Sequence, residues 1–290
     1  MKNTPFIAVT SQPVPYHADT TAIFNTLCQQ NSNSLLLDSA EIGSKNSLQS
    51  LILINAAVKI TCLGNQVTFR ALNANGKQVL KEIHPVLSQL GTVSAVNFDN
   101  EFSVQFAPLD NQLDEDSKLQ AATIFDGLRV ISNHYQHSST PVFLGGLFAY
   151  DLVANFIPMQ GVELKDDGIN CPDYSFYLAE NLITIDHQSQ QATLKSFCFS
   201  QEEQVEVAKT ALSIAQKLKN IDGVLSIKAA SDEVSTNFED PEFTGIVKAL
   251  KHHINIGDVF QIVPSRRFSL ACPNTLASYA QLKLNNPSPY

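Results

Sequence analysis

The pattern of hydrophobic and polar residues along the chain predicts many short β-strands joined by tight turns, with helices between groups of strands. The predicted strands are 35–37, 58–63, 66–72, 101–106, 142–151, 175–187, 192–199 and 259–263. The predicted helices are 20–30, 85–90, 117–134, 201–218 and 240–256. Gly64-Asn65 and the stretch 188–191 supply hairpin turns between neighbouring strands. This order indicates the α+β class: mostly antiparallel sheets with outer helices.

Composition and charge exclude several classes of protein. The net charge of −9 and the pI near 5.2 argue against nucleic-acid binding, because no basic surplus neutralises phosphates. No apolar run approaches the ~20 residues of a membrane helix, and the N-terminus lacks the pattern of a signal peptide. Five widely spaced cysteines without a Cys-x-x-Cys pair indicate free thiols in a reducing compartment. We therefore expect a cytoplasmic protein that binds neither nucleic acid nor membrane.

The stretch 257–268 follows a predicted helix and combines a turn, a short strand and a basic end. Gly257 suits the left-handed conformation that ends a helix, and residues 259–263 are apolar except for Gln261. An amide within an apolar strand needs hydrogen-bond partners, which a protein core can supply. Gln261 is therefore either a satisfied core glutamine or a side chain that faces a cleft. The adjacent pair Arg266-Arg267 is interpreted as a solvated strand end.

The same stretch carries a resemblance to a known family. It reads Gly-Asp-Val-Phe-Gln-Ile-Val-Pro-Ser-Arg-Arg-Phe at 257–268 and is followed by Asn-Pro-Ser-Pro-Tyr at 286–290. Both segments are similar to those of the chorismate-using enzymes, and they most resemble anthranilate synthase component I. Aminodeoxychorismate synthases usually differ from the Val-Pro-Ser-Arg of 263–266, and water-using relatives typically carry a basic lysine at the position of Gln261. A glutamine cannot take a proton at neutral pH, which fits a family whose nucleophile is ammonia.

This resemblance implies a fold and a function for the parent protein. The fold would be part of the layered two-sheet fold of chorismate-using enzymes. The reaction would convert chorismate and ammonia to anthranilate and pyruvate, the first step of tryptophan biosynthesis. A partner glutamine amidotransferase subunit (component II) would supply the ammonia, Mg²⁺ would be the cofactor, and tryptophan would inhibit by feedback. Gln261, facing the cleft, is then the candidate catalytic residue.

A second match concerns the feedback site. In the family a Leu-Leu-Glu-Ser segment forms part of the tryptophan site, and here residues 36–39 read Leu-Leu-Asp-Ser. Ser39 matches the inhibitor-binding serine, and Asp38 stands where the family more often has glutamate. The local pattern offers another explanation, in which these two residues end a strand and cap a helix over 47–54.

Three further positions enter through the same resemblance. Pro289 and Tyr290 match the end of the partner segment that contacts tryptophan in the family. Gln49 aligns with a lysine of close relatives, so one contact of the site differs here. The resemblance therefore predicts a tryptophan site made of Ser39, Pro289, Tyr290 and Asp38.

The family's chain is much longer than these 290 residues, which stop where its catalytic half begins. The resemblance assigns 1–225 to a regulatory domain and 238–290 to the beginning of the chorismate-binding catalytic domain, linked by the polar stretch 220–237. The acidic run 114–116 is typical of a helix start, so we expect the Mg²⁺ ligands in the missing half and none here. This chain alone is expected to be inactive. The alternatives are an aminodeoxychorismate synthase component I, or a non-catalytic fragment that binds tryptophan or the amidotransferase subunit.

Overall fold

The computed structural model describes residues 5–28, 31–39, 48–97, 100–108, 110, 112–157, 171–221 and 233–287. Its contacts divide the chain into two compact units, residues 1–223 with 287–290 and residues 224–286. The described strands of the first unit are β1 (Ala8–Val14), β2 (Leu35–Leu37), β3 (Gln49–Leu63), β4 (Gln66–Ala71), β5 (Thr92–Asn97), β6 (Glu101–Gln105), β7 (Leu144–Phe148), β8 (Tyr174–Asp186) and β9 (Gln191–Cys198). Its described helices are α1 (Thr20–Cys28), α2 (Ala74–Leu87), α3 (Glu115–Gln120), α4 (Asp126–His134), the 3-10 helix η1 (Tyr150–Asn155) and α5 (Gln204–Lys217).

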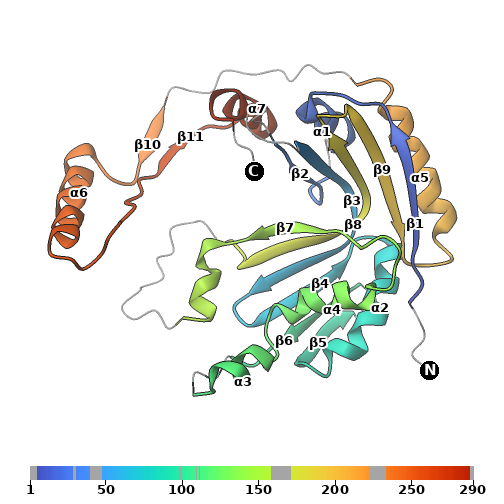
Figure 1. Cartoon of the computed structure of the whole chain (residues 1–290), viewed down its shortest axis with the longest axis horizontal. Helices are drawn as coiled ribbons and strands as arrows, with labels where there is room; N and C mark the ends of the chain where they lie inside the picture. Colours follow the sequence, from blue (N-terminus) through green and yellow to red (C-terminus); the bar gives the residue numbers. More distant parts are fainter. Residues whose placement is uncertain are drawn as a thin grey trace. The chain divides into compact units, whose positions relative to one another are not determined.

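Two long strands, β3 and β8, run antiparallel through the middle of the sheet, as Figure 1 shows. Each strand changes its outer partner halfway along its length. The first half of β3 pairs with β2 and the second half with β4, while β8 pairs first with β7 and then with β9. β1 extends the sheet beyond β9, and β6 and β5 extend it beyond β4. Every strand pairing of the described residues is antiparallel and the helices lie outside the sheet, so the predicted α+β class is confirmed.

The register between β3 and β8 shifts between Leu53 and Val58, where the outer partners change. Side-chain amides lie at this irregularity. Asn55 Nδ2 donates to Asn181 Oδ1 at 3.1 Å, and Asn181 Nδ2 donates to Ser196 Oγ at 2.8 Å. Buried polar groups cost stability unless they are hydrogen-bonded, and Asn181 is fully buried. The amides therefore satisfy one another at the point where the strand pair bends.

Two hydrophobic cores lie against this sheet. One contains residues of α2 and α4 together with β4, β6 and the second half of β3. The other contains residues of α1 and α5 together with β9, the first half of β3 and the second half of β8, and Figure 1 shows α5 beside β9 and β1. β3 contributes Val58 and Ile60 to the first core and Ile52 and Ile54 to the second. One strand therefore links both cores.

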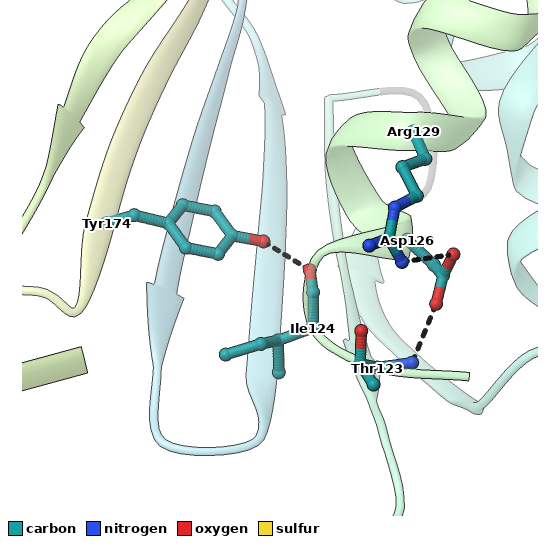
Figure 2. A network of polar contacts seen from close by, with 5 residues as sticks. All are labelled: Thr123, Ile124, Asp126, Arg129 and Tyr174. Atoms are coloured by element: carbon teal, nitrogen blue, oxygen red, sulfur yellow. Dashed lines mark hydrogen bonds and ion pairs between the residues drawn. The ribbon is translucent and has the colours of Figure 1, made fainter. Parts of the chain in front are cut away.

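The single helix predicted over 117–134 is wrong, because the structure has two helices, α3 and α4, with an irregular stretch between them. Figure 2 shows the contacts in this stretch. The buried hydroxyl of Tyr174 donates to the carbonyl oxygen of Ile124 at 2.6 Å. The backbone N–H of Thr123 donates to the carboxylate of Asp126 at 2.7 Å, at the start of α4. These tertiary and capping contacts override the helical pattern of the sequence.

The second unit contains β10 (Val234–Thr236), α6 (Asp240–Asn255), β11 (Phe268–Leu270) and α7 (Thr275–Asn285) among its described residues. Gly257 follows α6 with a φ of +83°, so the predicted left-handed turn is confirmed. Arg266 is only 15% exposed in its side chain and forms an ion pair of 2.6 Å with Asp240. Its guanidinium also lies over the rings of Phe243 and Phe268. The interpretation of Arg266 as a solvated strand end is therefore wrong.

A carboxylate, Glu180, is buried in β8. Asn73 Nδ2 and Asn75 Nδ2 each donate to Glu180 Oε2 at 2.8 Å, and Asn73 also caps α2 through a bond from the backbone N–H of Gly76. Burial raises the pKa of Glu180 above its ordinary value, and the two amide hydrogen bonds offset only part of that rise.

This raised pKa predicts a pH-dependent effect of Glu180→Gln. Because the folded pKa lies above the unfolded one, Glu180 stabilises most below pH 4.5, and this contribution is lost as pH rises through the folded pKa. The variant does not titrate there, so its free energy of unfolding should rise relative to that of the wild type as the pH increases from 4.5 to 7.5. Urea unfolding at several pH values measures this difference, with the exposed Glu202→Gln as a matched control. A pH-independent difference would contradict the prediction.

Candidate functional site

The predicted inhibitor residues Asp38 and Ser39 lie directly after β2, next to the first residues of β3. The three leucines at 35–37 form the predicted strand, in which Leu35 packs against the first hydrophobic core and Leu36 against the second. The alternative that Asp38 and Ser39 cap a helix over 47–54 is wrong, because β3 occupies that stretch from residue 49 onward. The two residues therefore sit at one end of the long β3–β8 pair.

Ser50 lies at the centre of the polar contacts next to Ser39. Its side chain is fully buried, and its Oγ donates to Asp38 Oδ1 at 2.5 Å. The backbone N–H of Ser39 donates to the same Oγ at 3.4 Å. The second carboxylate oxygen of Asp38 accepts a hydrogen bond of 2.8 Å from Thr20 Oγ1, at the start of α1. Asp38 therefore holds the end of β2 to both α1 and β3.

His187 extends these contacts from the end of β8. Its Nε2 lies 2.9 Å from Ser50 Oγ, and its Nδ1 lies 3.3 Å from the hydroxyl of Tyr16, two residues after β1. The backbone N–H of His187 donates to the carbonyl oxygen of Leu48 at 3.0 Å, which keeps the histidine beside the start of β3. Segments far apart in the sequence therefore converge next to Ser39.

This group contains a serine, a histidine and an aspartate, but their arrangement does not support nucleophilic catalysis. A catalytic serine gives its proton to a histidine, whereas Ser50 donates to the carboxylate of Asp38. Ser50 is also 0% exposed, so a substrate cannot reach its hydroxyl. The contacts instead fix the position of the half-buried Ser39, whose hydroxyl is the candidate ligand group.

The neighbouring strand ends are also fixed. Gln49, which aligns with the family's lysine, is exposed at the start of β3 and pairs with Asp186. The carboxylate of Asp186 accepts bonds of 2.9 Å from the backbone N–H groups of Ser189 and Gln188. These bonds, chiefly the one from Ser189, lower the pKa of Asp186 and close the turn that follows His187.

The structure does not place the remaining predicted site residues in a common pocket. Gln261 is exposed in the irregular stretch between α6 and β11. The strand predicted over 259–263 is wrong, because this stretch pairs with no strand of the described residues and leaves Phe260 fully exposed. Without a paired neighbour, an apolar pattern cannot form a sheet strand. Pro289 and Tyr290, predicted to contact tryptophan, lie outside the described residues.

Neither a metal-binding cluster nor a helix suited to cross a membrane occurs in the described part of the chain. No three His, Cys, Asp or Glu side chains there are grouped so that they could hold a metal ion. The acidic run 114–116 begins α3 as predicted: Asp114 accepts from the backbone N–H of Ser117 at 2.9 Å, which lowers the pKa of Asp114. No described helix combines the length and apolar character that crossing a bilayer requires.

Comparison with known proteins identifies the family. A model of the chorismate binding enzymes matches residues 81–290. The chain belongs to this family. It is 88% identical over 285 residues to "Anthranilate synthase component 1" of Haemophilus influenzae, covering 98% of this chain and 55% of that relative. Relatives of the same name from Vibrio cholerae and Escherichia coli are 43% and 38% identical, over 100% and 95% of this chain and 56% and 53% of theirs.

These chorismate binding enzymes confirm the predicted resemblance to anthranilate synthase component I, and the chain spans about half the length of the curated relatives it matches. A crystal structure of anthranilate synthase component I from Streptococcus pneumoniae matches with a TM-score of 0.52 at 18% identity, covering 95% of this chain and 53% of that one. At this identity the likeness bears on the fold alone, and it agrees with the predicted fold of chorismate-using enzymes.

The sequence indicated Ser39 and Asp38 but not the residues that contact them, Ser50, His187 and Tyr16. Ser50 carried a signal, since it is a polar residue directly before an apolar run in β3. His187 and Tyr16 carried none that pointed here, because 137 residues separate Ser50 from His187 and 171 separate Tyr16 from His187. The pairing of β3 with β8 brings Ser50 and His187 together, and the pairing of β1 with β9 brings Tyr16 to the same place.

Proposed function

We propose that this chain is part of an anthranilate synthase component I. The reaction converts chorismate and ammonia to anthranilate, pyruvate and water, at the first step of tryptophan biosynthesis in the cytoplasm. The observation that carries the proposal is the 88% identity, over nearly the whole chain, to the Haemophilus influenzae protein of that name. A glutamine amidotransferase subunit is the proposed partner that releases the ammonia from glutamine.

Gln261 is the proposed catalytic residue of this chain. Its amide can donate and accept hydrogen bonds but cannot remove a proton, which suits ammonia, a nucleophile in its neutral form. The residue is exposed in the stretch between α6 and β11, so its side chain is free to face chorismate in the complete enzyme. The Val-Pro-Ser-Arg of 263–266 supports this assignment over an aminodeoxychorismate synthase.

Magnesium is the proposed cofactor of the complete enzyme, in which it would neutralise a substrate carboxylate. The described residues do not fit such a site, because Mg²⁺ needs carboxylate oxygens in near-octahedral geometry and no cluster of suitable ligands is present among them. We assign the ligands to the part of the relatives that this chain does not match.

Tryptophan is the proposed feedback inhibitor, bound by the hydroxyl of Ser39 with Pro289 and Tyr290. Ser39 is half-buried at the end of β2, where a ligand can reach it. Asp38 belongs to the same site by its position, and its carboxylate contacts Thr20 and Ser50. A non-catalytic fragment that binds tryptophan or the amidotransferase subunit is the second candidate.

We predict that the chain alone is inactive. The chain alone should form no anthranilate from chorismate, ammonia and Mg²⁺, because the described residues supply no metal site. Addition of the segment of the Haemophilus influenzae relative that this chain does not match should produce anthranilate, followed by its fluorescence. We call this combination the assembled enzyme.

Three other outcomes have distinct meanings. Turnover by the chain alone, above the rate without protein, would contradict its inactivity. Aminodeoxychorismate in place of anthranilate would identify the related synthase. The absence of product in every combination, together with binding of tryptophan or the amidotransferase subunit, would identify the non-catalytic fragment.

Ser39→Leu should weaken feedback in the assembled enzyme. The variant loses the hydroxyl that contacts tryptophan and adds a bulky side chain, so we expect about tenfold more tryptophan for half-inhibition at unchanged turnover. Inhibition curves for the variant and for Ser132→Leu, an exposed position in α4, provide the comparison. Equal sensitivity of the Ser39 variant and the wild type would remove Ser39 from the site.

Gln261→Lys should impair ammonia addition in the assembled enzyme. A lysine brings a charge and a base to a position where neutral ammonia needs neither, so we expect at least a tenfold loss of anthranilate formation, a barrier increase of about 1.4 kcal/mol. Product analysis would also reveal any addition of water. If Gln261→Ala leaves ammonia-dependent turnover unchanged, the amide has no catalytic role.

A further inference from the structure

The contacts of Ser50 determine which nitrogen of His187 acts as a hydrogen-bond donor next to Ser39. With Asp38 ionised, its carboxylate can only accept, so the single proton of Ser50 points to Asp38. Ser50 Oγ must then accept from His187, and the proton of the imidazole lies on Nε2. The other nitrogen, Nδ1, lies 3.3 Å from the hydroxyl of Tyr16, which can either donate or accept. The contacts of Ser50 therefore place a proton on Nε2 of His187.

Through this arrangement, His187 affects the position of Ser39, because both residues contact the same atom, Ser50 Oγ. Ser50 is fully buried, so its hydroxyl cannot turn to water when a protein partner is lost. The Nε2–H of His187 and the backbone N–H of Ser39 both donate to Ser50 Oγ, while its proton is held by Asp38. Without the histidine donor, the buried Ser50 Oγ loses one of its two hydrogen-bond donors. The rotamer in which Ser50 contacts Asp38 and Ser39 is then less strongly favoured.

We propose that His187 is a positioning residue of the tryptophan site, which acts through Ser50 to fix Asp38 and Ser39. The inference rests on the proposed function of Ser39. His187 touches neither substrate nor inhibitor in this account. Its contribution is the Nε2–H donor alone, because the Tyr16 contact is longer, at 3.3 Å, and lies on the far side of the ring.

Two substitutions of His187 separate the donor from the bulk of the ring. A glutamine side chain extends its amide nitrogen to about the place of Nε2, whereas the shorter asparagine reaches only the place of Nδ1. His187→Gln keeps the donor to Ser50, and His187→Asn removes it. A role in packing alone would not distinguish the two amides in this way, since glutamine and asparagine both replace the ring by a neutral amide.

The experiment measures tryptophan binding and inhibition in the assembled enzyme. The chain contains no tryptophan, so none of its own residues contributes to the indole fluorescence of the ligand. We expect His187→Asn to raise the dissociation constant about tenfold, His187→Gln to stay within about twofold, and Tyr16→Phe to do the same. The same two substitutions at the exposed His137 should leave the constant unchanged.

The controls separate the failure of this inference from the failure of the proposed function. If Ser39→Leu leaves binding unchanged, the proposed inhibitor site is wrong and this inference with it. If Ser39→Leu weakens binding while His187→Asn and His187→Gln behave alike, only the role of His187 is wrong. Nitrogen NMR of the imidazoles tests the proton directly in the unsubstituted chain, with His187→Gln used to assign the signal. A neutral His187 protonated on Nδ1 would overturn the proposal even if a variant failed to fold.

Discussion

The pairing of β3 with β8 is the constraint on which the rest of the first unit depends. Both strands are longer than any of their outer partners, and each exchanges one outer neighbour for another near its midpoint. The register of the pair shifts between Leu53 and Val58, where the half-buried Asn55 donates a hydrogen bond to the buried amide of Asn181. The shifted pair lets β3 serve two cores, with α2 and α4 against one and α1 and α5 against the other.

The candidate inhibitor site follows from this geometry. The start of β3 and the end of β8 meet because the two strands are antiparallel, and β2 ends beside the same point. Ser50, His187 and Asp38 therefore converge although no local sequence pattern joins them. α1 contributes Thr20 at its first turn because the second core holds that helix against β3. The strand pair thus positions the residues that contact the end of β2.

Local sequence patterns correctly predicted the turns and strands whose formation depends on residues close together in the sequence. Gly64 forms the hairpin turn with a φ of +57°, and the leucines at 35–37 form a strand because both of its faces meet apolar cores. They failed where contacts between residues far apart in the sequence determine the secondary structure. Tyr174 binds the carbonyl of Ile124 inside a stretch that reads as one continuous helix. Residues 259–263 have the composition of a strand but no strand partner among the described residues. The proposed role of Asp38 and Ser39 rests on the resemblance, whereas the contact between His187 and Ser50 is visible only in the tertiary structure.

The buried hydroxyls beside Ser39 are better explained by the orientation that they impose on Asp38 and Ser39 than by a gain in folding stability. Thr20 and Ser50 are fully buried, and an apolar residue at either place would avoid the cost of removing a hydroxyl and its carboxylate partner from water. An apolar side chain at these positions would lack the directional hydrogen bonds of a hydroxyl group. A hydroxyl that donates to Asp38 and accepts from both Ser39 and His187 permits one rotamer and one backbone placement. Apolar contacts would tolerate several. The proposed tryptophan site requires the hydroxyl of Ser39 in a fixed position, so a fixed rotamer of Ser50 is useful there. An ordinary strand end at the surface has no such requirement.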